Sequence, residues 1–217
     1  MKTLMKTLIM GDIHGNLIAL ELVLKKYLNE VDKIICHGDV VNYGPWSNEC
    51  VEILDSLNII CLKGNHEEAF INGYYSGNNK LVHEFFSITY PKFNRLDLIN
   101  VYQYSYKSDS FDVFHSLNNN YFFPDSNFDD VNIDKNTIIG HSHYSFIKLL
   151  NNKNYLINTG SVGQNRKNLN TIEFCIYDSK IDKYEIKQIQ YNAEQIIKQM
   201  ILEDYPIDCI NYYKSKL

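Results

Sequence analysis

Apolar and polar positions along the first third of the chain predict three strand–turn–helix units. Residues 4–10 form an apolar run that ends at Gly11, which is typical of a buried strand. In residues 16–28 apolar residues recur every three or four positions, which predicts a helix that Asn16 can cap. The same patterns continue with strands at 32–39 and 58–65 and a helix at 46–57. Units of this kind imply a parallel sheet with crossover helices.

The middle of the chain, at about 67–108, has a different pattern. It consists of short amphipathic stretches broken by Gly73, Gly77 and Pro91, which predict short helices and loops. The segment is either a cap over a site or an ordinary helical insertion, and the pattern does not choose between them.

The last part of the chain is rich in strand patterns. β-branched and aromatic runs predict strands within 110–116, 136–143, 145–158 and 170–191, with hairpin turns at 151–154 and 178–182. A helix follows at about 193–203, and the tail from 205 fits a second short helix. Because neither an internal repeat nor a low-complexity linker interrupts the chain, we expect residues 1–217 to form a single domain with a cap-like helical insertion at about 67–108.

Composition narrows the class of function. The formal net charge is -5 and Arg95 and Arg166 are the only arginines, so no basic face for long nucleic acid is expected. A small phosphoester fits this charge, because bound metal could supply the missing positive charge. The five cysteines are odd in number and include no CxxC pair, which favours reduced thiols in a cytoplasmic protein. Neither a signal peptide nor an apolar run of the roughly 18 residues of a membrane span is expected.

A histidine pair in the sequence IGHSHY, residues 139–144, raises the question of a metal site. If the preceding strand reaches this point, residues i and i+2 point the same way, and His141 and His143 converge on one spot. Neutral imidazoles are common metal ligands. The pair alone does not decide the matter, because two nearby histidines also occur by accident or with ordinary hydrogen bonds.

Further donors follow the other strands. Five short turns lie at expected strand ends, where sites form in open α/β sheets: 11–16 (GDIHGN), 38–39 (GD), 64–67 (GNHE), 114–116 (FHS) and 140–143 (GHSH). They carry two carboxylates, four imidazoles and one amide, namely Asp12, Asp39, His14, His115, His141, His143 and Asn65. This mixed set suits Mn, Fe, Zn, Co or Ni better than Ca or Mg. Seven ligands are too many for one ion and about right for two ions that share a carboxylate.

The ordered set of motifs resembles the calcineurin-like metallophosphoesterase superfamily, in particular its small prokaryotic phosphodiesterase-type branch. The resemblance spans about residues 4–177 and includes INTGSVGQNR at 157–166, where Thr159 replaces the usual proline. It implies an α/β fold, a four-layer α/β/β/α sandwich of two mixed sheets flanked by helices, with two divalent metal ions.

The resemblance also implies roles for the donors. Asp12, His14 and His143 would hold one ion, Asn65, His115 and His141 the other, and Asp39 would bridge them. His66 would face the substrate as general acid while a metal-bound hydroxide attacks phosphorus.

Several residues near the motifs have open roles. Tyr43 and Arg166 are candidates for the substrate pocket, although Arg166 with Lys167 is otherwise a solvated turn. Asn16 is expected both to cap its helix and to lie near the phosphate. Glu67 is either a partner of a ligand or only an acidic residue in the first turn of a helix. His37 is expected to make a plain hydrogen bond beside Asp39.

The second motif departs from that of protein phosphatases and symmetrical dinucleotide hydrolases of the superfamily. It reads Val41-Asn42-Tyr43-Gly44, without the Asp-Arg-Gly whose arginine grips phosphate. We therefore expect a phosphodiesterase for small nucleotide-like or cyclic phosphodiesters. The alternatives are a phosphomonoesterase or dinucleoside polyphosphate hydrolase and, more remotely, a non-catalytic scaffold. Because dimers and larger assemblies are common among relatives, a homo-oligomer is compatible with the resemblance.

Overall fold

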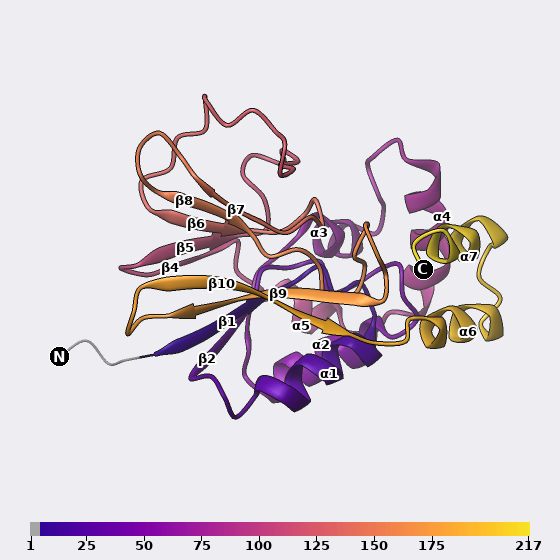
Figure 1. Ribbon diagram of the computed structural model, residues 1–217. Helices are drawn as coiled ribbons and strands as arrows, with labels where there is room; N and C mark the ends of the chain where they lie inside the picture. The colour runs from indigo at the N-terminus through magenta and orange to yellow at the C-terminus, as the bar shows by residue number, and fades with distance from the viewer. Residues whose placement is uncertain (1–4) are drawn as a thin grey trace.

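The computed structural model describes residues 5–217, so Leu4, the expected start of the first strand, lies outside the described residues. Two five-stranded sheets face each other (Figure 1). The first sheet has the order β10 (Lys183–Gln190), β9 (Thr171–Asp178), β1 (Lys6–Met10), β2 (Lys33–Cys36) and β3 (Ile60–Cys61). Its three strands β1, β2 and β3 are parallel, as the strand–turn–helix units predict, while β9 and β10 are antiparallel additions.

The second sheet is also mixed. Its order is β4 (Ser105–Lys107), β5 (Phe111–Phe114), β6 (Asn136–Ile139), β8 (Tyr155–Asn158) and β7 (Phe146–Leu149). Strands β5, β6 and β8 are parallel, and the edge strands β4 and β7 are antiparallel. The expected fold class, α/β with two mixed sheets flanked by helices, is confirmed.

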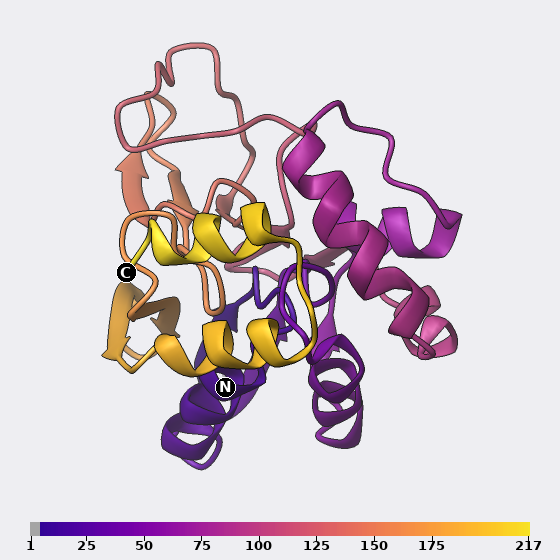
Figure 2. The ribbon, with the colours of Figure 1, turned by 90° about the vertical axis from the view of Figure 1, so that its right-hand side faces the viewer.

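The helices gather on one face and at one end of the molecule. Their bounds are α1 (Leu17–Tyr27), α2 (Ser47–Ser56), α3 (Asn65–Asn72), α4 (Lys80–Thr89), α5 (Leu96–Asn100), α6 (Glu194–Leu202) and α7 (Ile207–Lys214). Helices α1, α2 and α5 lie under the first sheet (Figure 1), and α4, α6 and α7 come together at one end, as Figure 2 shows. The expected helices at 16–28, 46–57 and 193–203 and in the tail are confirmed.

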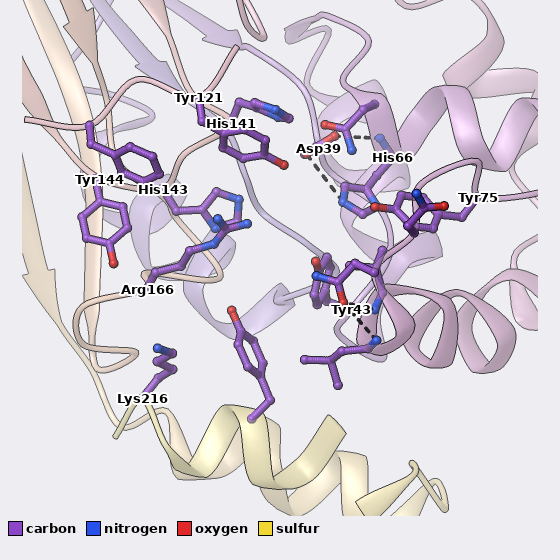
Figure 3. A pocket seen from close by; sticks show the side chains of 17 residues that line it. Asp39, Tyr43, His66, Tyr75, Tyr121, His141, His143, Tyr144, Arg166 and Lys216 are labelled. Atoms are coloured by element: carbon purple, nitrogen blue, oxygen red, sulfur yellow. Dashed lines mark hydrogen bonds and ion pairs between the residues drawn. The ribbon is translucent and has the colours of Figure 1, made fainter. Parts of the chain in front are cut away.

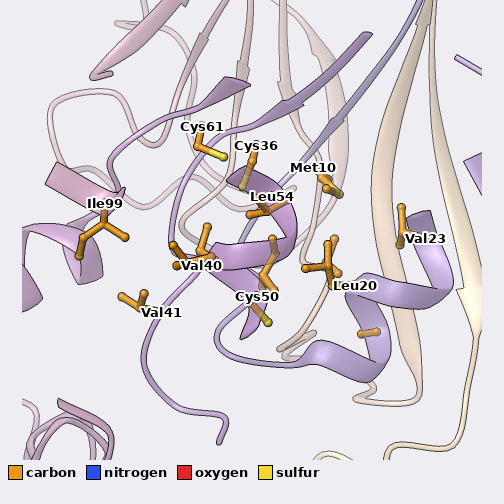
Figure 4. Close-up of a cluster of buried hydrophobic side chains, with 14 of the residues drawn as sticks. Met10, Leu20, Val23, Cys36, Val40, Val41, Cys50, Leu54, Cys61 and Ile99 are labelled. Carbon is orange, nitrogen blue, oxygen red and sulfur yellow. The ribbon is translucent and has the colours of Figure 1, made fainter. Parts of the chain in front are cut away.

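Apolar side chains fill the space on both faces of the sheets. Ile9, Ile35 and Ile138 belong to the core between the two sheets. Met10, Cys36 and Leu54 belong to the core beneath the first sheet, where α1 and α2 pack (Figure 4). On the outer face of the second sheet, Ile139 and Leu156 pack against Phe128 and Ile133 of the irregular segment 115–135.

Two strands differ from the expectation. The strand expected over 58–65 is reduced to Ile60–Cys61: the Leu62 N–H still bonds to the Cys36 carbonyl, but the Lys63 N–H bonds to the Gln103 carbonyl in an isolated bridge. Strand β4, within the segment expected to hold only helices and loops, was missed. It is an edge strand stabilised by pairing with β5, so its strand character depends on a distant partner rather than on its own pattern.

Gly163 allows a close approach that no other residue permits. A Cβ there would lie 1.7 Å from the Ile13 carbonyl oxygen, a backbone atom that cannot move aside alone. We expect Gly163→Ala to reduce the free energy of unfolding by about 1–3 kcal/mol, the usual cost of overpacking. Gly77→Ala is the control, because its Cβ would meet only the tip of the Tyr75 side chain. Chemical denaturation of both variants measures the difference, and equal stabilities would contradict this explanation.

Candidate metal centre

The turns after five strands bring the seven expected donors together. Asp12 and His14 follow β1, Asp39 follows β2, and His115 follows β5. Asn65 begins α3, while His141 and His143 follow β6. All of them except the half-buried Asn65 are buried. Figure 3 shows Asp39, His66, His141 and His143 around one cavity.

Asp12, His14 and His143 form a first cluster, with ligand atoms within 4.8 Å of one another. The His14 and His143 Nε2 atoms are 3.2 Å apart, and Asp12 Oδ1 lies 3.4 Å from His143 Nε2. Asp12 Oδ2 accepts a hydrogen bond from the His141 backbone N–H at 2.9 Å. Among residues 5–217 the buried Asp12 Oδ1 has no hydrogen-bond partner, so one oxygen of this carboxylate is left for the cluster.

His115, His141 and Asn65 form a second cluster around the His115 Nε2 atom. Asn65 Oδ1 and His141 Nδ1 each lie 3.1 Å from it. Asp39 Oδ2 lies 3.2 Å from the same atom and 3.8 Å from His14 Nε2. Since Asp39 Oδ1 accepts from the His66 backbone N–H, Oδ2 is free to face both clusters.

The tautomers of two imidazoles show that the donors fit a cation. His14 Nδ1 contacts the Val41 carbonyl at 3.2 Å, and His143 Nδ1 contacts the Gln164 carbonyl at 2.7 Å. Because a carbonyl only accepts, both Nδ1 atoms carry the hydrogen, and both Nε2 atoms present lone pairs to each other. Two facing lone pairs beside a buried carboxylate repel unless a positive charge joins them. The residues present therefore fit metal ions.

The backbone at the donors corrects one expectation. Strand β6 ends at Ile139, so His141 and His143 do not converge as alternate residues of a strand. Both have positive φ, 70° and 63°, and their imidazoles join different clusters. Asp12, His14 and Asp39 also have positive φ. Left-handed conformations at non-glycine residues store strain and often mark functional sites.

Burial and charge shift the protonation of the donors. Burial raises the pKa of Asp12 to about 8, with a further contribution from the Asp39 carboxylate. At His115, burial favours the neutral ring, but Asp39 and the other carboxylates outweigh it and raise the pKa to about 9. In the absence of a cation, protons thus supply part of the positive charge that the cluster requires.

Glu67 holds the turn that carries Asp39. Its buried carboxylate accepts backbone hydrogen bonds from Gly64, Asp39 and Val40 at 2.7–2.8 Å. Burial raises the pKa of Glu67 to about 7. Of the two roles left open by the sequence, the structure supports the partner of a donor, because Glu67 fixes two of the site's turns to each other.

His37 lies beside Asp12 and His115, and the ligand atoms of the three residues are within 4.8 Å of one another. Its Nε2 contacts the hydroxyl of Thr159 at 2.8 Å, which is the residue that stands where the resemblance expects proline. A Cβ at Gly140 would lie 2.0 Å from the His37 ring, so that glycine makes room for it. Burial lowers the pKa of His37 to about 3, so it stays neutral. The expected plain hydrogen bond is present, with Thr159 as the partner.

A hydrogen bond from Asn42 fixes the tautomer of His66. The Tyr43 backbone N–H can only donate, and it lies 2.8 Å from Asn42 Oδ1, which identifies that atom as the oxygen. The Thr89 hydroxyl is also 2.9 Å from Oδ1. Asn42 Nδ2 therefore donates to His66 Nδ1 at 2.9 Å, and the His66 hydrogen is on Nε2, 4.0 Å from Asp39 Oδ2.

A cavity of about 640 Å³ opens from the two clusters. Tyr43 and Arg166 line it, as expected for substrate contacts, so Arg166 is not merely a solvated turn. Asn16 does not reach it, and its expected place near the phosphate is corrected. The Asn16 side chain is fully buried, caps α1 by accepting from the Ala19 N–H, and donates to the Gly163 carbonyl and Tyr191.

Other residues of the cavity were missed by the sequence. They are mainly aromatic or cationic and come from distant segments: Tyr75, Tyr121, Phe123, Tyr144, Tyr212 and Lys216. The sequence carries no signal for them, because tyrosine is abundant throughout the chain. Asn42 was also missed as the partner of His66, although its place in the second motif was a usable signal.

Comparison with known proteins identifies the family. The family profile of calcineurin-like phosphoesterases matches residues 5–179. The chain belongs to this family. Its membership confirms the resemblance drawn from the motifs and supports a phosphoric ester hydrolase, and the clusters of His and Asp are suited to the family's two metal ions.

Relatives match nearly the whole chain. The uncharacterized protein MJ0912 of Methanocaldococcus jannaschii is 30% identical over 225 residues, covering 91% of this chain and 93% of that protein. A metallophosphoesterase from Sphaerobacter thermophilus superimposes with a TM-score of 0.82 at 24% identity, covering 99% and 100% of the two chains. The hypothetical protein PH1004 from Pyrococcus horikoshii gives 0.83 at 14% identity, covering 96% and 97%. The two structures show that the fold is shared.

Within residues 5–217, no helix has the length and apolar character to cross a membrane.

Because Asp39 faces both clusters, its substitution is predicted to impair metal binding at both. We expect Asp39→Asn, purified without chelator and loaded with Mn²⁺, to lose metal from both clusters, because one carboxylate oxygen faces both. His66→Ala should retain metal, since Asn42 holds the His66 hydrogen on Nε2 and leaves that atom without a lone pair for an ion. Elemental analysis of both variants beside the unaltered protein measures the difference. Equal metal loss in the two variants would refute this division of roles.

Stability without metal should depend on pH. Folded-state pKa values near 8 for Asp12 and 9 for His115 exceed their ordinary values of 3.8 and 6.5, so the folded state binds more protons than the unfolded chain. We therefore expect the melting temperature of chelated protein to fall as pH rises from 7 to 9. Saturating Mn²⁺ should remove most of this decline. A melting temperature of chelated protein that rises or stays level over this range would contradict the assignment.

Proposed function

We propose that this chain is a dinuclear metal-dependent phosphodiesterase acting on small nucleotide-like diesters. The observation that carries the proposal is the shared Asp39 carboxylate between two donor clusters, with the His66 Nε2 hydrogen beside it at the edge of an open cavity. Family membership supports phosphoester hydrolysis as the reaction.

The two clusters have distinct ligands. Asp12, His14 and His143 would hold one ion, and Asn65, His115 and His141 the other, with Asp39 shared. Two divalent ions, when bound, polarise phosphoryl oxygens and increase the acidity of water. Mn, Fe, Ni, Co and Zn all suit these nitrogen and oxygen donors.

His66 is proposed to donate a hydrogen bond to the leaving oxygen rather than to act as the expected general acid, because burial lowers its pKa and keeps the ring neutral. Its Nε2 hydrogen is held in place because Asn42 occupies Nδ1. As the oxygen of water bonds to phosphorus and the bond to the leaving oxygen breaks, the His66 Nε2–H donates a hydrogen bond to that oxygen and stabilises its growing negative charge. The proton that water loses passes through solvent to the leaving oxygen. The ring is buried against Tyr43, at 5.2 Å between centroids, so its orientation is restricted.

Arg166 and Tyr43 are proposed to position the phosphate. Arg166 lines the cavity beside His143 (Figure 3), and its buried Nε has no hydrogen-bond partner within the described residues. A phosphate oxygen would supply that partner. Tyr43 packs edge-on against His14, with ring centroids 4.7 Å apart, and so closes the wall of the cavity behind the imidazoles.

Segment 75–82 supports the proposal of a cap. Tyr75, Asn78, Asn79, Leu81 and Val82, between α3 and the first turns of α4, line the cavity. The rest of the expected insertion packs elsewhere, since α5 contacts α2 and α3. We propose that only this part of 67–108 covers substrate.

Activity against model esters tests the proposed function. We expect hydrolysis of bis(p-nitrophenyl) phosphate with at least one of Mn²⁺, Ni²⁺, Co²⁺, Zn²⁺ and Fe²⁺, and slower hydrolysis of p-nitrophenyl phosphate. A tenfold or greater preference for the monoester would favour a phosphomonoesterase. Inactivity with every metal, together with far less than one equivalent of bound metal, would favour a scaffold instead.

The pairing of Asn42 with His66 gives a sharper test. We expect His66→Ala to lower kcat for the diester by about 10²–10³-fold, the range for a hydrogen-bond donor to developing negative charge. Asn42→Ala should lower kcat by roughly tenfold with little change in KM, because it releases the His66 tautomer. If the two act as a unit, the double variant is no slower than His66→Ala alone. Effects that multiply would show that Asn42 acts independently, and metal analysis of each variant serves as control.

A further inference from the structure

The cavity contains more positive charge than one phosphodiester requires. Arg166 and Lys216 both line it, and among the described residues of its lining the only acidic one is Asp39, which faces the metal clusters. Within residues 5–217 neither cation forms an ion pair with a carboxylate. Lys167 lies on the outside of the same wall, with its Nζ 5.3 Å from the centroid of the Tyr144 ring.

The two cations lie at different depths. In Figure 3, Arg166 reaches toward His143, whereas Lys216 lies farther from the imidazoles. The Lys216 Nζ is 5.8 Å from the centroid of the Tyr212 ring, and the Arg166 guanidinium carbon is 5.9 Å from that of Tyr121. A phosphate at the metal clusters can therefore use Arg166, and Lys216 is left for a second anionic group.

Lys216 has a fixed backbone position. The Leu169 N–H donates to the Lys216 carbonyl at 2.6 Å, and the Lys216 N–H donates to the Tyr213 carbonyl at 3.0 Å. Tyr213 is fully buried in the core that α4, α6 and α7 share. The end of α7 is thus tied to the loop that carries Arg166, so the two cations form one wall of the cavity.

Aromatic rings complete that wall and the one opposite. Tyr212 lies against Lys216, Tyr144 lines the same cavity with Lys167 over its ring, and Tyr75 and Phe123 line other parts of the cavity. Each is partly exposed and lines the cavity, where a planar ligand can contact it. Rings of this kind stack on nucleobases without selecting a particular base. At about 640 Å³, the cavity falls within the range of small-ligand sites.

We propose that Lys216, with the rings of Tyr144 and Tyr212, forms a second anion subsite that selects nucleotide diesters carrying a further phosphate group beyond the one hydrolysed. This inference rests on the proposed phosphodiesterase function. It disfavours cyclic mononucleotides, whose single phosphate would occupy the metal clusters and leave Lys216 without a partner.

A matched pair of substrates tests the subsite. The dinucleotides pApA and ApA contain the same diester bond and differ only in a terminal phosphate. With Mn²⁺, we expect kcat/KM for diester cleavage to be at least tenfold higher for pApA. Lys216→Gln should reduce this ratio at least fivefold. Lys214→Gln, which removes an exposed charge at the last residue of α7, outside the cavity, should leave the ratio unchanged.

Binding without turnover provides a second measurement. In chelated protein, pApA should bind at least fivefold more tightly than ApA by calorimetry, and Lys216→Gln should remove the difference. Equal values of both kcat/KM and affinity for the pair would overturn the subsite, as would a ratio that Lys216→Gln leaves intact. Hydrolysis of bis(p-nitrophenyl) phosphate separates the two proposals. If the protein hydrolyses this ester but cleaves pApA and ApA at equal rates, only the subsite is refuted. If the protein does not hydrolyse it with any metal, the phosphodiesterase function is refuted as well.

Discussion

The constraint on which this structure depends is the close packing of groups that repel one another in the absence of a cation. Two imidazole lone pairs face each other at 3.2 Å, and the carboxylates of Asp12 and Asp39 lie close enough for Asp39 to raise the pKa of Asp12. Taking such groups out of water is costly unless positive charge accompanies them. The surrounding protein must therefore hold the donors in place against their mutual electrostatic repulsion.

The chain does this mainly through its backbone. The donors lie in turns just beyond the strands, where left-handed residues aim the side chains inward, and Glu67 ties the turn carrying Asp39 to Gly64. Gly140 and Gly163 allow neighbouring segments to approach where a Cβ would collide. These features hold the site in shape before any ion binds, which is the preorganisation that metal-assisted catalysis requires.

Sequence patterns predicted the donors better than they predicted the cavity. Asp12, Asp39 and His141 could be placed because each follows a recognisable strand, and parallel strands end at the same edge of a sheet. The geometry at His141 and His143 was wrong in detail, since a strand period does not describe turn residues with positive φ. Tyr121 and Lys216 were not predictable, because their place depends on an irregular loop and on the docking of α7 rather than on a local pattern. Asn42 and Thr159 show a further limit, as each departs from the expected motif yet forms a hydrogen bond to a buried histidine, which only the structure reveals.

The tie between Leu169 and the end of α7 has a consequence for biosynthesis. Every donor of the two clusters precedes Arg166 in the chain, whereas Lys216 follows β9, β10 and α6. On the ribosome, the residues able to capture ions emerge well before the last wall of the cavity. The donors are thus synthesised before the residues around the end of α7 that complete the enclosure of the cavity.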